Sequence, residues 1–177
     1  MNDPVILTTD RLTLRPFDTN VHLTERYVAW LNDPDVVRYS EQRHRTHSLE
    51  SCRAFVAGFN NGPSRLWAIE RTADGLHIGN IHADIDSANR LADVAVLLGA
   101  REVWGQGYGL EAWNAVLDWL LGSGGIRKAV AGCMQSNAAM VRIMAHSGMV
   151  PDGTRSAHYL LNGNPEDIIF CARFSNA

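Results

Sequence analysis

The sequence predicts one α/β domain of the α+β kind: a mixed, mostly antiparallel sheet of about seven strands with helices on both faces. Two observations lead to this prediction. The chain has 177 residues of ordinary globular composition, which suits one well-filled core and is short for two. Its apolar patterns follow the order strand, two helices, three strands, helix, strand, helix, two strands. We therefore treat residues 1–177 as a single domain.

The first half of the chain is predicted to supply a strand, two helices and three successive strands. Arg11–Arg15 alternates polar and apolar side chains like a strand, and Val21–Leu31 has apolar residues at helical spacing. Ser48 is the expected N-cap of a second helix, with Glu50 and Ser51 in its first turn, that ends at the sequence NNGP. The three strands, the first two joined by a TADG turn, are expected at Leu66–Arg71, Leu76–Asp86 and Ala92–Gly99.

The second half opens with the sequence WGQGYG and an apolar helical stripe that continues to Leu121, where the glycines of GSGG end the helix. Lys128–Met134 is the next expected strand, and Asn137–His146 the next helix, followed by Ser147 and Gly148. Two final strands, separated by the turn LNGNPED, are expected near Met149–Leu161 and Asp167–Phe174.

Charge and cysteine usage restrict the class of protein. The formal net charge of -3 provides no general attraction for nucleic acid. No stretch has the apolar length of a membrane span, and the N-terminus does not read as a signal peptide. Cys52, Cys133 and Cys171 are far apart in the sequence and form no CxxC pair, which favours a reducing, cytoplasmic location.

Three alternate glycines, Gly105, Gly107 and Gly109, lead directly into the helix that follows them. A helix that begins at glycines presents unpaired backbone N–H groups and a positive dipole end, which suits an anion such as a phosphate. The Lys and Ser or Thr of a P-loop are missing, and the glycine spacing is not that of a dinucleotide fingerprint. The glycine pattern must therefore be interpreted together with the segments that surround it.

That context is a strand, ADVAVLLG, a short loop, AREV, and the WGQGYG helix start, which together resemble the acyl-CoA-binding motif of the GNAT superfamily of N-acetyltransferases. WGQGYGLEA is similar to the branch of ribosomal-protein N-terminal acetyltransferases, with Trp104 at the usual Gln or Arg position. Further segments resemble the family in the same order: TDRLTLRPF, YVAWLNDPDVVRY, IGNI and SNAAMVRIMAHSGMV. The resemblance covers nearly the whole chain.

The resemblance implies acetyl-CoA as the acyl donor. Amides at the start of the helix would hold its pyrophosphate, and larger side chains at the second or third glycine would obstruct this. The pantetheine arm would pair with the preceding strand, and an Asn at the start of a later helix would contact the donor. The residues implied are Gln106, Gly107, Tyr108 and Gly109, then Val96, Leu97 and Leu98, and finally Asn137. The structural alternative is that the glycines only permit close packing and Asn137 is only an N-cap.

The catalytic groups are less clearly marked. Many family members have a Tyr seven residues after the Asn that protonates the leaving thiolate, but that position is Met144 here, so water is the expected proton source. Attack by an amine also requires a base. Asp93, where relatives often carry Glu, and His82, which shares a strand face with Asp84, are the candidates. Each also has a purely structural interpretation, as a solvated strand-end Asp and a satisfied strand His.

The acceptor is expected to contact the early helices and the last hairpin, as is general for this fold. Asp33 and Glu41 would attract an ammonium group, whereas the basic run Arg43–Arg45 would contact a carboxylate or phosphate. The candidate residues are Trp30, Tyr39, Glu41, Arg43 and Tyr159. The alternatives are that the aromatic residues belong to the core and that the charged run is a solvated loop. His44 and His47 lack further ligands at suitable spacing, so no metal site is expected.

We therefore expect a cytoplasmic N-acetyltransferase that transfers an acetyl group from acetyl-CoA to a primary amine by direct attack in a ternary complex. The acceptor classes left open are a protein N-terminus, an amino sugar, an aminoglycoside or another small amine. A non-catalytic acyl-CoA-binding or sensing domain is the alternative, because the usual Tyr is missing. No nucleic-acid or membrane partner is expected, and a homodimer remains an option because dimers are frequent in this fold.

Overall fold

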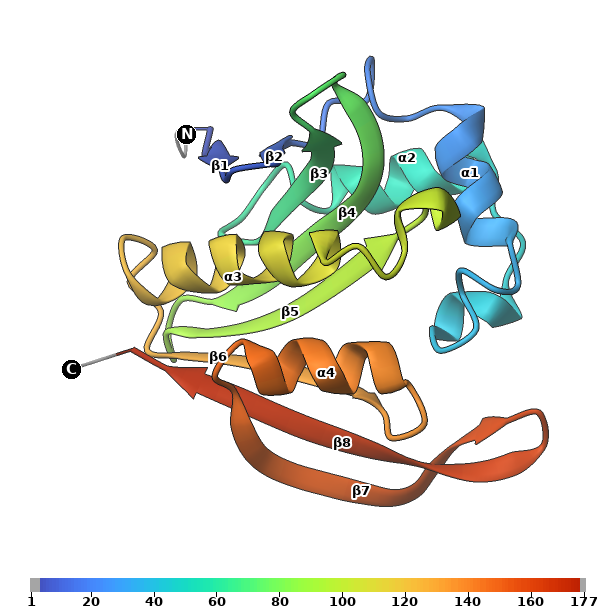
Figure 1. Ribbon diagram of the computed structural model, residues 1–177, viewed down its shortest axis with the longest axis vertical. Helices are drawn as coiled ribbons and strands as arrows, with labels where there is room; N and C mark the ends of the chain where they lie inside the picture. The colour runs from blue at the N-terminus through green and yellow to red at the C-terminus, as the bar shows by residue number, and fades with distance from the viewer. Residues whose placement is uncertain (1–3, 176–177) are drawn as a thin grey trace.

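The computed structural model describes residues 4–175 and shows an eight-stranded sheet with the order β1-β2-β3-β4-β5-β6-β8-β7 (Figure 1). All neighbouring strands are antiparallel except β5 and β6, which are parallel. The predicted fold class is confirmed, with one more strand than expected because β1 is too short to show alternation. The strands are β1 Leu7–Thr8, β2 Leu12–Pro16, β3 Arg65–Arg71, β4 Leu76–Asp86, β5 Leu91–Leu98, β6 Lys128–Met134, β7 Val150–Leu161 and β8 Asn164–Phe174.

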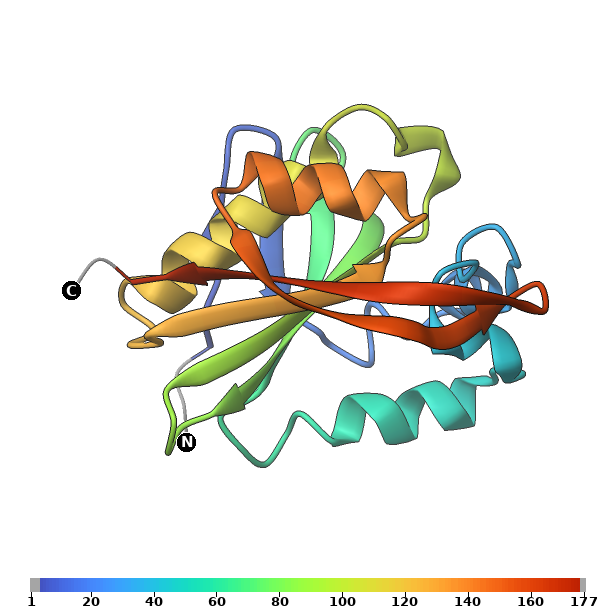
Figure 2. The ribbon, with the colours of Figure 1, turned by 90° about the horizontal axis from the view of Figure 1, so that it is seen from below.

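Helices cover both faces of the sheet, with α3 and α4 on one side and α2 on the other (Figure 2). Within residues 4–175, none of them is long and apolar enough to cross a membrane. The α-helices are α1 Glu25–Asn32, α2 Leu49–Ala57, α3 Tyr108–Leu121 and α4 Ala138–His146, and two short 3-10 helices are η1 Glu41–His44 and η2 Arg101–Val103.

Two predicted boundaries are wrong by a few residues, each for a local reason. Helix α1 begins at Glu25 rather than Val21, because the hydroxyl of Thr24 accepts the Tyr27 N–H (3.3 Å) and caps the helix there. Strand β8 begins at Asn164 rather than Asp167. Its turn needs only Asn162 and Gly163, which have φ angles of 52° and 82° and reverse the chain in two residues.

The start of α2 is confirmed as a reciprocal cap. The Ser48 hydroxyl accepts the Ser51 N–H (3.2 Å), and the Ser51 hydroxyl accepts the Ser48 N–H (2.9 Å). Two backbone N–H groups that would otherwise lack partners are thereby satisfied. The helix ends at Ala57, before the predicted NNGP stop, and its last turn places Phe55 on the surface.

The core leaves one part of the sheet uncovered. Along β5, Ala92 and Val94 are buried beneath α3, whereas Asp93 and Ala95 on the opposite face are exposed. At Asp93, β5 has neighbours on both edges, so exposure of this residue means that no helix covers this face of the sheet there. Strand β5 therefore presents the Asp93 side chain on an uncovered part of the sheet face, on the α2 side.

The close packing of α1 on the sheet yields a stability prediction. A Cβ at Gly99 would lie 1.9 Å from Cδ2 of Trp30, whereas a Cβ at Gly62 would meet no atom within 4 Å. We expect Gly99→Ala to lower the free energy of unfolding by about 2 kcal/mol or more, because a buried indole must move. Gly62→Ala should change it by less than about 1 kcal/mol. Urea denaturation measures both, and equal effects would contradict this packing.

Candidate functional site

The strands β5 and β6 run side by side only at their beginning. Leu91–Asp93 pairs in parallel with Lys128–Val130, and beyond these residues the two strands diverge (Figure 1). Strand β5 nevertheless continues its pairing with β4 as far as Leu98. The edge of β5 that faces β6 is therefore without a strand partner along residues 94–98, and Asp93 lies at the point of divergence.

The main-chain groups of β5 alternate between this open edge and β4. The Gly99 N–H donates to the Ile78 carbonyl in β4 (3.1 Å), so Leu97 also faces β4, while Val96 and Leu98 face the open edge. The Leu98 carbonyl accepts a hydrogen bond from the Trp104 indole (2.9 Å). The edge at Val96 thus suits an added extended ligand, whereas the predicted contribution of Leu97 is restricted to its side chain.

The first turn of α3 supplies N–H groups close to this edge. Its first intrahelical hydrogen bond runs from the Glu111 N–H to the Gly107 carbonyl (3.1 Å), so the N–H groups of residues 108–110 precede the helical ladder. Gly107 is the N-cap and contributes no side-chain cap. The predicted role of Gln106 needs correction, because its N–H donates to the Val103 carbonyl (3.4 Å) and its side chain to the Glu102 carbonyl (2.8 Å).

Glycine is required at two positions of this helix start for different physical reasons. Gly107 has a φ of 84°, which an L side chain rarely adopts. Gly109 has a tertiary reason, because a Cβ there would lie 3.2 Å from both Leu98 Cδ1 and Ile143 Cδ1. The first glycine shapes the turn, and the second lets α3 approach β5 and α4. Close packing therefore explains Gly109, as the structural alternative proposed, but it does not explain Gly107.

Arg11 fixes the position of this helix start from β2. Its guanidinium donates to Glu111 (Nε to Oε2, 2.6 Å) and to the Gln106 carbonyl (3.0 Å), and it lies over the Tyr108 ring. Glu111 also accepts from the Thr9 hydroxyl (2.6 Å). Burial opposes ionisation of Glu111, but these hydrogen bonds outweigh it and lower its pKa. An ionised carboxylate in the first turn stabilises the positive end of α3.

On the α2 side of the sheet, the candidate base lies in a cluster of ionisable groups. Asp93 is directly opposite Asp84 across β4 and β5, and Asp84 Oδ2 lies 3.7 Å from His82 Nε2. Loss of hydration raises the pKa of Asp93, and the negative charge on Asp84 raises it further. Burial lowers the pKa of His82, against the opposite effect of Asp84. The structure thus brings together both predicted catalytic residues and adds Asp84 to them.

Two aromatic rings adjoin this cluster that the sequence analysis did not assign to the site. Phe55 and Phe59 have ring centroids 6.1 and 5.7 Å from that of His82. Phe55 lies in the last turn of α2 and Phe59 two residues beyond its end, and apolar side chains at such helical spacing usually have a core role. Their spacing of four residues could have indicated a shared surface, but nothing in the sequence connects them to His82.

The predicted acceptor residues do not all line one site. Trp30 lies in the core, because its indole packs against Gly99 and against the rings of Tyr27 and His77. Arg43 bridges η1 to β7, donating to the carbonyls of Ser40 (2.8 Å) and Leu160 (3.0 Å). Neither residue is therefore available to an acceptor as predicted.

The remaining predicted acceptor residues lie on the surface near η1 and the last hairpin. Glu41 pairs with Arg43 at 2.7 Å, and Asp33 lies 3.5 Å from Arg101. Tyr39 lies beneath the Arg38 guanidinium, and the partly exposed Tyr159 packs against His158. The two acidic groups expected to attract an ammonium ion thus already have cationic partners.

Helix α4 involves two residues discussed in the sequence analysis, Asn137 at its start and Met144 within it. The Asn137 side-chain oxygen accepts the Met140 N–H (3.2 Å), so Asn137 is the N-cap of α4 and its amide NH2 group is not needed for capping. Met144 is 1% exposed and belongs to the core. The side chain at the usual Tyr position therefore neither donates a proton nor reaches the protein surface.

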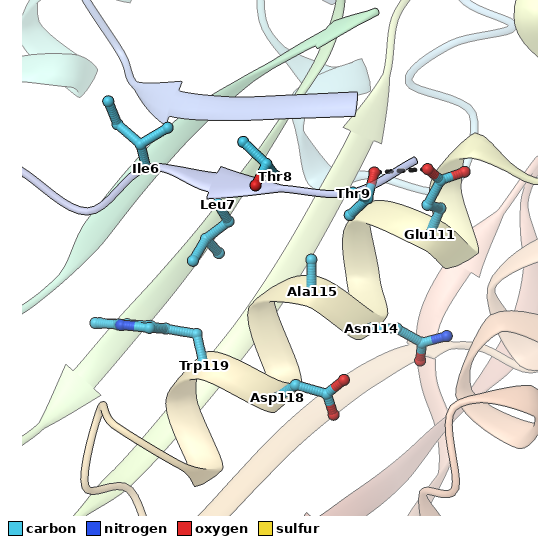
Figure 3. A pocket seen from close by; sticks show the side chains of 9 residues that line it. All are labelled: Ile6, Leu7, Thr8, Thr9, Glu111, Asn114, Ala115, Asp118 and Trp119. Atoms are coloured by element: carbon cyan, nitrogen blue, oxygen red, sulfur yellow. Dashed lines mark hydrogen bonds between the residues drawn. The ribbon is translucent and has the colours of Figure 1, made fainter. Parts of the chain in front are cut away.

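A cavity of about 530 Å³ lies beside α3, between that helix and β1 (Figure 3). Leu7, Ala115 and Trp119 are its apolar lining, and Glu111 at one end is occupied with Thr9. Neither Asp93 nor His82 contributes to it. For residues 4–175, no three His, Cys, Asp or Glu side chains are grouped so that they could hold a metal ion. The candidate site is therefore the opening at β5 rather than this cavity.

A family model described as an acetyltransferase (GNAT) domain matches residues 11–150. The chain belongs to the GNAT acetyltransferase family. This membership confirms the resemblance found in the sequence and the enzyme class, that of an N-acetyltransferase. A comparison with curated protein sequences gave no match.

Solved structures share the GNAT fold at low sequence identity. The ribosomal-protein-S5-alanine acetyltransferase from Vibrio fischeri has a TM-score of 0.82 at 16% identity, covering 97% of each chain. An acetyltransferase from Salmonella typhimurium that modifies the N-terminal serine of ribosomal protein L7/L12 has a TM-score of 0.81 at 21% identity, covering 97% of this chain and 100% of that one. Spermidine N-acetyltransferase from Vibrio cholerae, solved with CoA and spermine, has a TM-score of 0.83 at 19% identity, with 94% and 97% covered.

The ionisation of Asp93 can be tested without a substrate. In a carboxyl NMR titration, the midpoint of Asp93 should lie above the ordinary range of aspartic acids. Asp84→Asn should lower that midpoint by removing the neighbouring charge, but not to the ordinary value, because desolvation remains. Asp86, whose pKa is lowered by hydrogen bonds from Asn89, is an internal reference that should titrate below the ordinary range. A wild-type midpoint for Asp93 at or below the ordinary range would contradict this arrangement.

Proposed function

We propose that this GNAT acetyltransferase uses acetyl-CoA to acetylate a primary amine by direct attack in a ternary complex. The observation that carries the proposal is the arrangement at the divergence of β5 and β6. An unpaired strand edge and a helix N-terminus lie there, together with the candidate base Asp93. Each feature has a separate role in one reaction.

The donor side of this arrangement fits acetyl-CoA. Pyrophosphate is an anion, and the N–H groups at the start of α3 and the dipole of that 14-residue helix favour an anion at this end. The pantetheine arm contains amide groups, which match the N–H and C=O groups presented by Val96. The presence of CoA in the structure of the spermidine N-acetyltransferase supports this choice of donor.

The chemistry needs a neutral amine and a proton acceptor. An acceptor ammonium gives one proton to the Asp93 carboxylate, and the free nitrogen pair then attacks the acetyl carbonyl carbon. A nitrogen–carbon bond forms and the carbon–sulfur bond breaks; the second proton on the nitrogen passes to water, and water protonates the departing thiolate because Met144 carries no acidic hydrogen. A raised pKa makes Asp93 a better proton acceptor than an ordinary carboxylate. His82, with its lowered pKa, is a second group able to accept a proton near neutral pH.

A non-catalytic acyl-CoA sensor remains the second candidate because the usual Tyr is replaced by Met144. The two functions differ in a simple measurement. An enzyme releases free CoA faster when an amine is supplied, whereas a sensor binds acetyl-CoA and leaves it intact. The uncovered sheet face at Asp93 favours the enzyme, because a sensor requires no space for an acceptor.

Calorimetric titration with acetyl-CoA tests the donor site. We expect micromolar binding by the wild-type protein and a loss of roughly 100-fold or more in Gly107→Glu, whose carboxylate opposes the pyrophosphate. Gly163→Glu is the matched control: its φ of 82° is similar to the 84° of Gly107, but it lies in the β7–β8 turn. This control should bind normally. Absence of binding to the wild-type protein would exclude acetyl-CoA as the donor.

Replacement of the base tests the acid–base step. In a thiol-release assay, Asp93→Asn should lower kcat by about 100-fold or more, with little change in the acetyl-CoA affinity. The deficit should shrink as the pH rises toward the pKa of the amine, because an already neutral amine needs no base. Glu25→Gln, which removes an exposed carboxylate from α1, is the control. A rate for Asp93→Asn within two-fold of wild type would assign the proton transfer to another group.

A further inference from the structure

An aromatic pair lies at the C-terminal end of α2, with Phe55 in its last turn and Phe59 two residues beyond it. The rings of Phe55 and Phe59 have centroids 5.2 Å apart at an interplanar angle of 71°. Helix α2 buries Cys52 and Val56 instead, and Phe55 is 44% exposed. A single exposed Phe needs no explanation, but two in mutual contact form a small apolar surface that the fold itself does not use.

This aromatic pair adjoins polar groups on the uncovered face of β4 and β5. Both rings are inclined steeply to His82, at 77° for Phe55 and 60° for Phe59. His82 shares its face of β4 with Asp84, and Asp84 is directly opposite Asp93. The aromatic pair, the imidazole and the two carboxylates therefore belong to one surface that α2 and β4–β5 form together.

The two carboxylates in this surface lack cationic partners. Considering residues 4–175, no Lys or Arg nitrogen lies within 4.0 Å of Asp84 or Asp93, and the one ring nitrogen at that range is His82 Nε2, 3.7 Å from Asp84. Other acidic groups have such partners, including Glu111 with Arg11 and Asp152 with Lys128. Two like charges directly opposite each other in a sheet are unfavourable. A cation bound between them would remove that repulsion.

We infer that the acceptor is a short aliphatic amine with a second ammonium group, held by Asp84 and the Phe55–Phe59 pair while the reacting amine lies at Asp93. This inference rests on the proposed function. Rings of Phe attract ammonium groups at their faces and also cover methylene groups from water. The opposed carboxylates are about 5 Å apart at their Cβ atoms, as is usual for paired strand residues, so a short chain suffices to engage both.

The same groups disfavour an acceptor with an anion close to its amine. A carboxylate or phosphate would meet Asp84 and Asp93, and the cation expected to bind such an anion, Arg43, is occupied with the carbonyls of Ser40 and Leu160. The aromatic pair would gain nothing from a negative charge, because its ring faces are themselves negative. Amino sugars with phosphate groups and amino acids are thus expected to be poor acceptors.

Three amines with the same four-carbon chain test the inference: putrescine, butylamine and γ-aminobutyrate, which end in an ammonium, a methyl and a carboxylate group. With saturating acetyl-CoA, we expect kcat/KM for putrescine to exceed that for butylamine by about ten-fold or more, as expected for one additional ion pair in a partly exposed site. γ-Aminobutyrate should be the poorest of the three. A peptide with a free N-terminus is added as a fourth acceptor, and preference for it would overturn the inference.

Variants then identify the groups responsible. Asp84→Asn also lowers the pKa of Asp93, but that effect applies equally to putrescine and butylamine, whereas the loss of the Asp84 charge weakens putrescine and not butylamine. The ratio of putrescine to butylamine should therefore fall to near one in Asp84→Asn. Phe55→Leu combined with Phe59→Leu keeps apolar volume without π faces and should lower the same ratio, while Phe174→Leu, equally exposed at the end of β8, should not.

The outcomes distinguish failure of this inference from failure of the proposed function. Thiol release with butylamine at a rate equal to that with putrescine would overturn the diamine preference and leave the acetyltransferase proposal intact. Binding of acetyl-CoA without thiol release from any amine would overturn both and indicate a sensor. A ratio unchanged in Asp84→Asn and in the double Phe variant would show that the preference arises elsewhere, which also contradicts the inference.

Discussion

The separation of β5 from β6 beyond Asp93 and Val130 is the constraint on which the rest of this structure depends. Elsewhere in residues 4–175, neighbouring strands pair along most of their length, with short register breaks in β3–β4 and β7–β8. Where the two strands part, backbone hydrogen-bonding groups are left without a protein partner, and leaving such groups unpaired is costly in a folded protein. We propose that a ligand completes the opening, and Asp93 lies where the opening begins.

The loop that carries the donor-side groups is held in place from the acceptor side. Arg101 pairs with Asp35 at 2.7 Å, and Arg26 of α1 pairs with Glu102 at 3.0 Å. Both Arg101 and Glu102 belong to η2, just before the glycines of the α3 start. Individual surface ion pairs contribute little, but two of them together with the Trp104–Leu98 hydrogen bond restrict one short segment. The position of α1 is thereby connected to the position of the α3 N-terminus.

Strand β4 carries two histidines, His77 and His82, that have different neighbours. The half-buried His77 packs against Trp30, and loss of hydration lowers its pKa to about 4, so the ring is neutral at pH 7 and contributes packing and a hydrogen bond to Asn80. Five residues along the same strand, His82 is partly exposed beside Asp84. Both rings are half-buried, and they differ in their neighbours: His77 packs against Trp30 of α1, whereas His82 packs against Phe55 and Phe59.

The sequence by itself determined the order of elements and the glycine-rich start of α3. Periodicity identifies most strands and helices directly, the Ser48 cap is local, and the glycine pattern before α3 is a local backbone requirement. Alternation along β5 also placed the Asp93 side chain on the sheet face opposite to that of the buried Val94. The sequence could not show which side chains meet across elements. Tertiary structure alone decided that Arg43 joins η1 to β7, that Trp30 is core, and that the Phe55–Phe59 pair adjoins His82. These facts depend on how α1, α2 and the last hairpin pack on the sheet, and contacts between residues so distant in sequence leave no trace in local spacing.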